Sequence, residues 1–407
     1  MNFKLLLTLA WRNLWRHPRR TIIMLVAIAL GVWMMLFTAA FMQGMLEQQV
    51  NDTISNLTGH VQIHHPKYRD DPAIENSMQI AQADIRSVMD DADVKQLSLR
   101  IRLPAVIASE RETGGVTLVG IDPQGEQGLS FIASSITDGR YLQSMDDTGI
   151  IIGKALADKL ETRLGKRIVV MSQDSKNEVA DRGFRVVGIY RAELQGTELA
   201  YAFTGLNTAR AMLKMGEQVS EVSLLSNQRE ELDSLANRLR ERFPTFEVMT
   251  WKELLPLLIA SLELYDAILI FWYLIIFFAM SFGLVNTLLM AVFERTREIG
   301  LFQALGMRPK FIILQILLES LILLLIGLSI GNLLTWLTVL SLSGGINLAA
   351  FAQGMEWVQM GSLLIPLLYM KDIITSNLLV IVLGLFASLY PAIRAARAVP
   401  VDAITRS

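Results

Sequence analysis

Four long stretches of the chain contain no charged residue. Asp, Glu, Lys and Arg are all absent from residues 21–46, 267–293, 320–355 and 373–393. A helix needs about 20 consecutive apolar residues to cross the hydrocarbon core of a bilayer. The pattern therefore predicts four transmembrane helices, at 21–43, 267–293, 311–342 and 377–393.

The section between the first and second of these helices, residues 44–266, has an ordinary polar pattern. Apolar and polar residues alternate at 61–65, as in a half-buried strand, and the short apolar runs at 116–121, 149–153, 167–171 and 184–190 also predict strands. Helical spacing occurs at 154–164, 206–215 and 229–243. We therefore expect a membrane protein with four transmembrane α-helices and a large α+β extracytoplasmic domain between helices 1 and 2. Helical stalks are expected where this domain meets the membrane.

Charge predicts the orientation of the helices. Residues 1–20 carry five Lys and Arg residues and no acid, and basic residues also dominate 294–310 and the tail 394–407. Short segments rich in Lys and Arg stay in the cytoplasm. Both termini are thus expected inside, with 1–20 as an interfacial amphipathic helix. The 44–266 domain and an apolar loop at 343–376 are expected outside. A cleaved signal peptide is disfavoured, because its apolar core would be shorter than this one.

Composition sharpens this division. Residues 44–266 contain 24 Lys/Arg and 33 Asp/Glu and have a charge of −9. The rest of the chain contains 13 Lys/Arg and 6 Asp/Glu and has a charge of +7, so the net charge is −2. No soluble section is basic, so nucleic acid is not an expected partner. The chain has no cysteine, which excludes disulfides, thiolate metal sites and a cysteine nucleophile.

No catalytic constellation is visible. The G-x-S-x-G motif of hydrolases does not occur, and the Gly-Lys pairs at 153–154 and 165–166 lack the other residues of a phosphate-binding loop. His60 and His64 would share a strand face, where a solvated surface is favoured over a metal site. We therefore expect no enzyme activity, no metal and no cofactor in this chain. ATP-driven work would come from another polypeptide.

The loop at 294–310 predicts a short amphipathic helix on the cytoplasmic side. Glu294 and Glu298 stand one turn apart, and the apolar residues Ile299, Phe302 and Leu305 form a stripe. Gly306 then ends the helix, and a proline begins the next segment. The alternative is a plain basic turn that anchors at the headgroups.

Three segments resemble a known family. The loop reads E-R-T-R-E-I-G-x-x-x-A-L-G from Glu294, the C-terminus reads Y-P-A-x-R-A-A-R-x-x-P-V-D-A-I from Tyr390, and the start reads A-W-R-N-L-x-R from Ala10. They resemble the permease superfamily that includes the bacterial cell-division permease, the macrolide-exporter permease and the lipoprotein-releasing permeases. The order of the segments matches along the whole chain, and the layout is most similar to the lipoprotein-releasing transmembrane subunits.

The resemblance implies a transmembrane subunit of an ABC-type assembly in a bacterial inner membrane. A separate cytoplasmic ATPase dimer, which holds ATP and Mg, would dock on the loop helix, called the coupling helix, and drive the outer domain mechanically. A second permease chain, identical or related, would complete the assembly. By this analogy, the docking residues are the polar and apolar side chains Glu294, Arg295, Arg297, Glu298, Ile299, Leu301, Phe302 and Leu305, with Gly306 shaping the turn.

Two further features are candidates for function. Glu319 is an acidic residue well inside the third transmembrane helix, where a carboxylate is costly and marks either a functional site or a structural contact with a neighbouring helix. The loop after that helix, residues 345–372, is unusually apolar for an external loop. It would suit either a lipid-bearing cargo or a simple anchor in the outer leaflet.

Three functions remain open. The first is release of lipoproteins from the inner membrane towards the outer membrane. Its partners would be lipoproteins and a periplasmic carrier that receives them. However, the 172–183 loop is polar and lacks the proline of a carrier-binding hook. The second is macrolide or peptide efflux, in which the ATPase is often fused to the permease. The third is regulation of the cell envelope, as by the cell-division permease, whose outer domain is typically much smaller.

Overall fold

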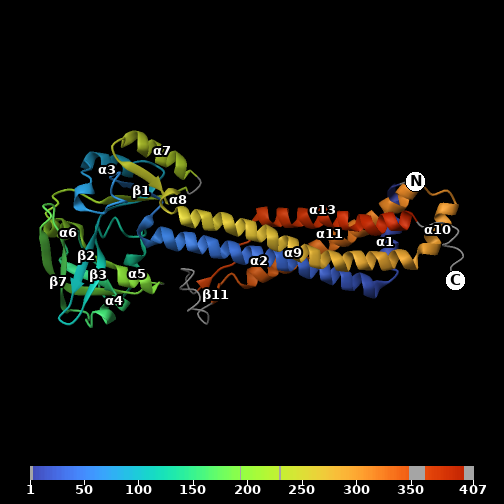
Figure 1. The fold of residues 1–407 in the computed structure, drawn as a ribbon, viewed down its shortest axis with the longest axis horizontal. Coiled ribbons are helices and arrows are strands. Elements are labelled where there is room, and N and C mark those ends of the chain that lie inside the picture. The colour runs from blue at the N-terminus through green and yellow to red at the C-terminus, as the bar shows by residue number, and fades with distance from the viewer. Residues whose placement is uncertain (1–2, 193, 229–230, 348–362, 398–407) are drawn as a thin grey trace. The chain divides into compact units, whose positions relative to one another are not determined.

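The computed structural model describes residues 3–192, 194–228, 231–347 and 363–397 (Figure 1). The chain separates into two compact units. We call the described residues of Met1–Leu46, Ser261–Asn347 and Leu363–Ser407 the membrane unit, and those of Glu47–Ala260 the sheet unit.

Within the described residues, four helices are long and apolar enough to cross a membrane, as the hydropathy pattern predicts. They are α2 (Pro18–Thr53), α9 (Pro256–Glu294), α11 (Pro309–Ser341) and α13 (Met370–Ala396). Each extends beyond the predicted apolar span at one end or both. The fourth begins at Met370 rather than at residue 377, so the end of the expected external loop is helical. With the strand-rich domain between the first and second helices, the predicted fold class is confirmed.

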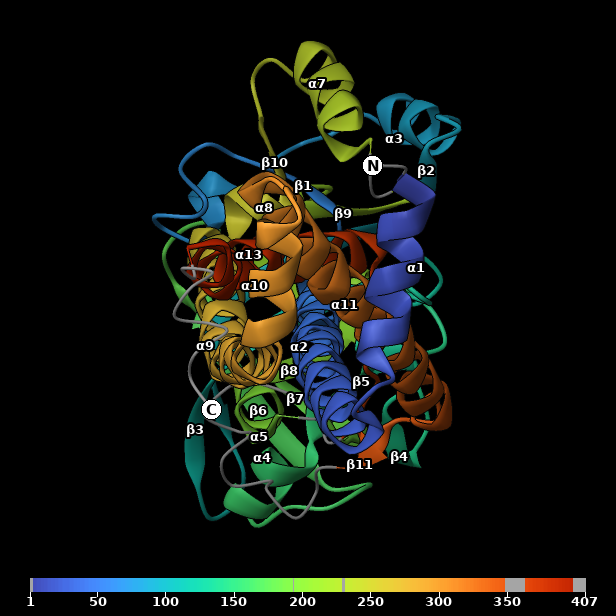
Figure 2. The ribbon, with the colours of Figure 1, turned by 90° about the vertical axis from the view of Figure 1, so that its right-hand side faces the viewer.

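The long helices lie alongside one another in the membrane unit (Figures 1 and 2). Their shared core contains buried side chains from all four, among them Met35, Phe277, Leu324 and Val380. Small residues allow the backbones to approach closely. A Cβ atom added at Gly331 on α11 would lie 2.7 Å from Val32 Cβ on α2, so only glycine fits this contact without a shift.

Two short helices lie near one end of this bundle (Figure 2). The first, α1 (Phe3–Leu14), packs Leu6 and Ala10 against Leu318 of α11. The second, α10 (Thr296–Ala304), lies between α9 and α11 in the chain. A small antiparallel pair, β11 (Ile346–Asn347) and β12 (Leu363–Leu364), flanks residues 348–362, which lie outside the described residues.

In the part of the sheet unit that the structure describes, ten strands form one sheet. They are β1 (Val61–His64), β2 (Val94–Ala108), β3 (Thr113–Ile121), β4 (Ile136–Gly139), β5 (Gly149–Gly153), β6 (Arg167–Gln173), β7 (Val179–Tyr190), β8 (Tyr201–Gly205), β9 (Glu221–Ser226) and β10 (Glu247–Thr250). Its helices are α3 (Gln82–Met89), α4 (Lys154–Lys159), α5 (Gln195–Ala200), α6 (Leu206–Leu213), α7 (Leu232–Arg242) and α8 (Trp251–Leu254). Single turns occur at η1 (Ile54–Thr58), η2 (Ile74–Asn76) and η3 (Phe131–Ala133).

The strand β2 organises this sheet. Its second half pairs with β3 and β6, and the pairings β2-β3-β8-β5-β7-β6 return to β2, which closes a ring of six strands. Its first half pairs with β9, which continues into β1 and β10. Arg100 is paired with Ile121 of β3 and with Glu221 of β9. It therefore stands where the two parts of the sheet meet.

All five predicted strands are present, but β2 is the longest strand and was not predicted. Its alternation of Leu97, Leu99, Ile101 and Leu103 with polar residues was the available signal. All three predicted helices are shorter than expected, and α6 ends at Leu213, because Lys214 is in a left-handed conformation. The α4 helix ends at Lys159, where Leu160 turns the chain and Glu161 follows with a positive φ of 48°, and α7 begins at Leu232.

Candidate functional site

The loop expected to couple to an ATPase is built from the end of α9, the helix α10 and the start of α11. Glu294 is the last residue of α9, and Arg295 precedes the first turn of α10. Gly306 follows the helix with a φ of +92°, a left-handed conformation that glycine adopts without strain. Pro309 then occupies the first turn of α11, where its missing N–H costs nothing.

The apolar residues of this loop divide into two groups. Ile299 is half-buried and packs against a cluster that includes Val292 and Ile312. Leu301, Phe302 and Leu305 are exposed, with 53%, 37% and 76% of their surfaces accessible. Exposed apolar side chains grouped on a short helix are typical of a surface that contacts a partner protein or a membrane. We call these three residues the α10 apolar face.

Most polar residues of the loop are occupied within the chain. Glu298 pairs with Arg16 at 2.6 Å between Oε1 and Nη1. Glu294 pairs with Arg20 at 2.7 Å between Oε2 and Nη1. Both partners come from the N-terminal segment, which was expected to face lipid headgroups. These two pairs bind the segment around α1 to the predicted coupling loop.

Arg295 is turned inward rather than towards a partner protein. Its Nη1 lies 3.1 Å from Oε1 of Glu319, and its Nη2 donates to the main-chain oxygen of Asn13 at 2.8 Å. The side-chain amide of Asn13 donates to the same Glu319 oxygen at 2.6 Å. Glu319 is 5% exposed, so the three residues form a buried polar contact among α1, α10 and α11. This geometry matches the structural alternative for Glu319.

Of the four polar residues predicted to dock the ATPase, only Arg297 has no ion pair within the residues that the structure describes. The sequence motif places all of them on one short segment, and that placement is observed. The spacing did not indicate which of these residues form contacts within the chain. Three hold the loop to the rest of the membrane unit, and the α10 apolar face remains available for contact.

A cavity of about 670 Å³ lies beside α10 in the membrane unit. Its walls combine aromatic residues of α1 and the turn after it, Trp11 and Trp15, with the polar contact around Glu319 and with Phe302 of α10. The two tryptophan rings meet edge to face, with centroids 6.0 Å apart. Tryptophan and arginine together are typical of a membrane border.

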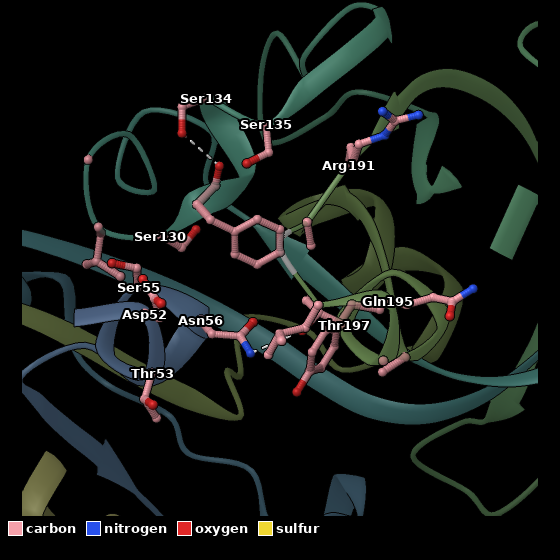
Figure 3. A pocket seen from close by; sticks show the side chains of 18 residues that line it. Asp52, Thr53, Ser55, Asn56, Ser130, Ser134, Ser135, Arg191, Gln195 and Thr197 are labelled. Atoms are coloured by element: carbon pink, nitrogen blue, oxygen red, sulfur yellow. Dashed lines mark hydrogen bonds between the residues drawn. The ribbon is translucent and has the colours of Figure 1, made fainter. Parts of the chain in front are cut away.

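The sheet unit has a larger cavity, of about 810 Å³, at the end of α2 (Figure 3). Among the described residues, its walls contain hydroxyl and amide groups, including those of Ser134, Gln195 and Thr197, together with the charged residues Arg191 and Asp52. The Asn56 amide donates to Thr197 at 3.3 Å. Such walls can form hydrogen bonds with a polar ligand.

The histidines at the start of the sheet unit are not on a solvated face, and that interpretation is wrong. His60 and His64 are 3% and 1% exposed. His64 is on β1, which lies between β9 and β10 in the sheet, and its Nδ1 is 3.4 Å from Oε2 of Glu247. Across the described residues, no group of three or more His, Cys, Asp and Glu could hold a metal ion. The apolar loop proposed for cargo falls largely on residues 348–362, outside the described residues.

Comparisons with known proteins agree with this architecture. Residues 21–242 match the family model of the MacB-like periplasmic core domain, and residues 270–400 match that of the FtsX-like permease C-terminal region. The chain is 24% identical to the lipoprotein-releasing system transmembrane protein LolE of Haemophilus influenzae, over 98% of each chain. It is 22% identical to the corresponding protein LolC of Neisseria meningitidis, over 94% of this chain and 93% of that one.

Among solved structures, the periplasmic region of MacB from Actinobacillus actinomycetemcomitans is similar at 15% identity and a TM-score of 0.35, covering 50% of this chain and 94% of that one. The MacB-like core model spans more than half of the chain, and the FtsX-like model covers the last three membrane helices. The chain therefore belongs to the ABC transporter permeases of the family that contains LolC, LolE and MacB.

Proposed function

We propose that this permease is the transmembrane subunit of a complex that releases lipoproteins from the bacterial inner membrane towards the outer membrane. The observation that carries the proposal is the similarity along nearly the full length of two lipoprotein-releasing transmembrane proteins. ATP hydrolysis would take place on a separate cytoplasmic ATPase dimer, which holds ATP and Mg. This chain would supply the docking surface and the moving parts.

The docking surface in this proposal is the α10 apolar face. Leu301, Phe302 and Leu305 expose apolar surface that is favourable to bury against a partner. The buried contact between Arg295 and Glu319 would fix the position of the loop, and the ion pairs of Glu294 and Glu298 with the N-terminal segment would add to it. Movement of the docked ATPase would then be passed to α1, α9 and α11 together rather than to a loose loop.

Pairing with a second permease chain, identical or related, is part of the proposal, because four helices are few for a route that accommodates a lipid anchor. The wholly helical course of α2 from Pro18 to Thr53 supports mechanical transmission, since a continuous helix resists bending. Transfer of the lipoprotein to a periplasmic carrier would be a further step. The 172–183 hairpin gives no specific support for this step, because it is polar and has no proline.

A second candidate is efflux of macrolides or peptides. It is favoured by the match of residues 21–242 to the MacB-like core domain. In this case the sheet unit would act on a periplasmic pump, and no acylated protein would be bound. The two candidates share the ATPase docking surface and differ in their cargo.

Replacement of Leu305 by Asp tests the docking surface. Burying an unpaired carboxylate at an apolar interface costs more than the ~1.4 kcal/mol that corresponds to a tenfold change in affinity. We expect at least tenfold weaker co-purification of the ATPase with the permease. Val179→Asp is the matched control, because Val179 is as exposed, 77% against 76%, and lies in the sheet unit. Unchanged ATPase binding by the Leu305 variant would remove α10 from the docking surface.

The cargo is tested with the purified permease–ATPase complex in proteoliposomes that contain an acylated lipoprotein and, separately, a macrolide. The proposal predicts ATP-dependent release of the lipoprotein and no transport of the macrolide. The reverse result would establish the efflux candidate and refute lipoprotein release.

A further inference from the structure

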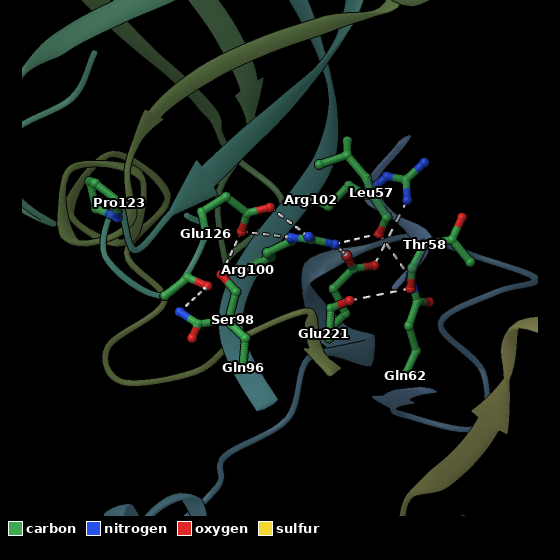
Figure 4. Close-up of polar contacts among 12 residues, drawn as sticks. Leu57, Thr58, Gln62, Gln96, Ser98, Arg100, Arg102, Pro123, Glu126 and Glu221 are labelled. Carbon is green, nitrogen blue, oxygen red and sulfur yellow. Dashed lines mark hydrogen bonds and ion pairs between the residues drawn. The ribbon is translucent and has the colours of Figure 1, made fainter. Parts of the chain in front are cut away.

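The sheet unit contains a buried charged cluster far in sequence from the α10 loop. Arg100 of β2 and Glu126, in the loop after β3, are fully buried, and Glu221 at the start of β9 is 2% exposed (Figure 4). Charged side chains are seldom buried unless they are paired with an opposite charge. Removing one member of a buried pair leaves the other charge uncompensated in a medium of low polarity. A cluster of this kind therefore holds its neighbours in a defined arrangement.

The guanidinium group of Arg100 makes contacts on three sides. Its Nη2 and Nε donate to the two carboxylate oxygens of Glu126, at 2.5 and 3.1 Å. Its Nη1 donates to Glu221 at 3.0 Å and also to the main-chain oxygen of Leu57. The two bonds to Glu126 use the planar fork that only arginine offers. The fourth bond links the strand to the chain that emerges from α2.

Leu57 belongs to η1, the single turn in which α2 ends. Its φ of 71° and ψ of −3° are left-handed, which is uncommon for a residue other than glycine. Its side chain is fully buried with Val119 and Phe203. Gln62 donates to the main-chain oxygens of Leu57 and Thr58, at 3.2 and 2.9 Å. The side chain of Leu57 is therefore held by packing, and its main-chain oxygen is held by hydrogen bonds.

The connection of the sheet unit to α9 is built differently. There α8 ends at Leu255, whose φ of −125° and ψ of 60° interrupt the helix before Pro256 begins α9. The ion pair that supports it joins Arg240 to Glu253 at 2.7 Å, and both side chains are about two-fifths exposed. Exposed pairs contribute little. The buried cluster therefore distinguishes the α2 end from the α9 end.

We propose that Arg100 is the positioning residue of a rigid joint, through which a displacement of α2 is passed to β2 and β9 of the sheet unit. The inference rests on the proposed function, because that function requires α2 to move the sheet unit. At this joint, η1 is prevented from acting as a hinge. If the Arg100 bonds were lost, motion of α2 would be absorbed by the strained turn at Leu57.

The test uses a variant designed to fold. Arg100→Met with Glu126→Gln and Glu221→Gln removes the three charges of the cluster and the donor to Leu57. Arg102 loses its contact with Glu221 but keeps a third of its side chain exposed and its bond to Tyr201. In the full-length permease–ATPase complex, we expect unchanged ATPase co-purification and ATP hydrolysis, with release of the acylated lipoprotein reduced at least tenfold. Ser98→Ala is the control, because it removes a bond to Glu126 but leaves the bond to Leu57. Release within twofold of wild type in the triple variant would overturn the proposal.

A distance measurement tests the joint independently of cargo. The chain has no native cysteine, so spin labels can be placed with Gln48→Cys near the end of α2 and Lys95→Cys on β2. We expect one narrow distance distribution, identical without nucleotide and with vanadate-trapped ADP, and a broad, nucleotide-dependent distribution in the triple variant. A nucleotide-dependent distance in the otherwise wild-type complex would overturn the joint. Failure of the wild-type complex to release lipoprotein would refute the proposed function and leave this measurement intact.

Discussion

At the scale of single residues, burial separates charges that look alike in the sequence. Arg100 and Arg102 occupy equivalent alternate positions on β2, yet Arg100 is fully buried and Arg102 keeps about a third of its side chain exposed. Arg100 compensates for burial with two carboxylates, whereas Arg102 lies 3.9 Å from Glu221 and 5.4 Å from the ring of Tyr201. The surroundings, rather than residue type, determine what each arginine does.

The buried cluster predicts a pH-dependent stability. Burial by itself raises the pKa of Glu126, but the charge and hydrogen bonds of Arg100 outweigh it and hold that pKa below its usual 4.5. The stabilisation is therefore complete above about pH 4.5 and is lost as the pH falls through the lower pKa of the folded state. We expect the unfolding temperature of the sheet unit, followed by circular dichroism of the full chain, to fall on acidification below pH 4.5.

Glu126→Gln should flatten this acid-dependent decline, since the amide does not titrate. It should also lower the unfolding temperature at pH 7, because breaking a buried ion pair costs about 3–5 kcal/mol. An acid profile as steep as that of wild type would show that other carboxylates govern the transition.

At the scale of elements, α1 and α10 act as one structure. The N-terminal segment was expected to lie on lipid headgroups, but Arg16 and Arg20 bind acidic residues of the α10 loop, and Asn13 binds Glu319. The pattern of basic residues did not distinguish between lipid phosphate and protein carboxylate as their partner. The contacts make α1 part of the support for the proposed docking surface.

A charge swap tests this support. Glu298→Arg alone places two cations together, so we expect several-fold lower lipoprotein release by the complex. Arg16→Glu with Glu298→Arg restores an ion pair of reversed direction, and release should return to within about twofold of wild type, because an exposed pair contributes only about 0.2–1 kcal/mol. If Glu298 instead contacts the ATPase directly, the double variant will remain as impaired as the single one.

At the scale of the whole molecule, charge and hydropathy point to the same division of the chain. The section with a charge of −9 contains the sheet unit, and the remainder, with +7, contains most of the membrane unit. The four membrane helices and the permease relatives support a multi-pass inner-membrane protein. The positive charge of the short connecting segments supports cytoplasmic termini as a proposal.

Cysteine labelling tests this orientation, since no native cysteine interferes. Glu110→Cys, in the exposed turn between β2 and β3, should react with a membrane-impermeant maleimide in intact spheroplasts. Ala304→Cys, exposed on α10, should react only after the membrane is permeabilised. Labelling in the opposite order would reverse the topology and place the proposed ATPase surface outside the cell.

The membrane helices and the loop motif could be predicted from the sequence because each depends on residues within one short segment. A span without charges predicts a membrane helix wherever it occurs, and Gly306 and Pro309 mark the boundaries between α10 and α11. The five predicted strands could be recognised for the same reason, since their apolar runs are also local signals. The strand β2 alternates as well, but its polar positions suggest an exposed face, which the chain around Leu57 and Glu126 covers.

The number of membrane helices, the division into membrane and polar sections and the position of the candidate coupling loop could all be predicted from the residues alone. These features depend on hydropathy, charge and residue spacing within short segments. The pairing of charges, in contrast, became known only from the three-dimensional structure. Arg295 and Glu319 stand 24 residues apart, Arg100 and Glu221 stand 121 apart, and Arg16 and Glu298 stand 282 apart. Such partners meet only when the helices pack and the sheet closes, because an ion pair depends on proximity in space.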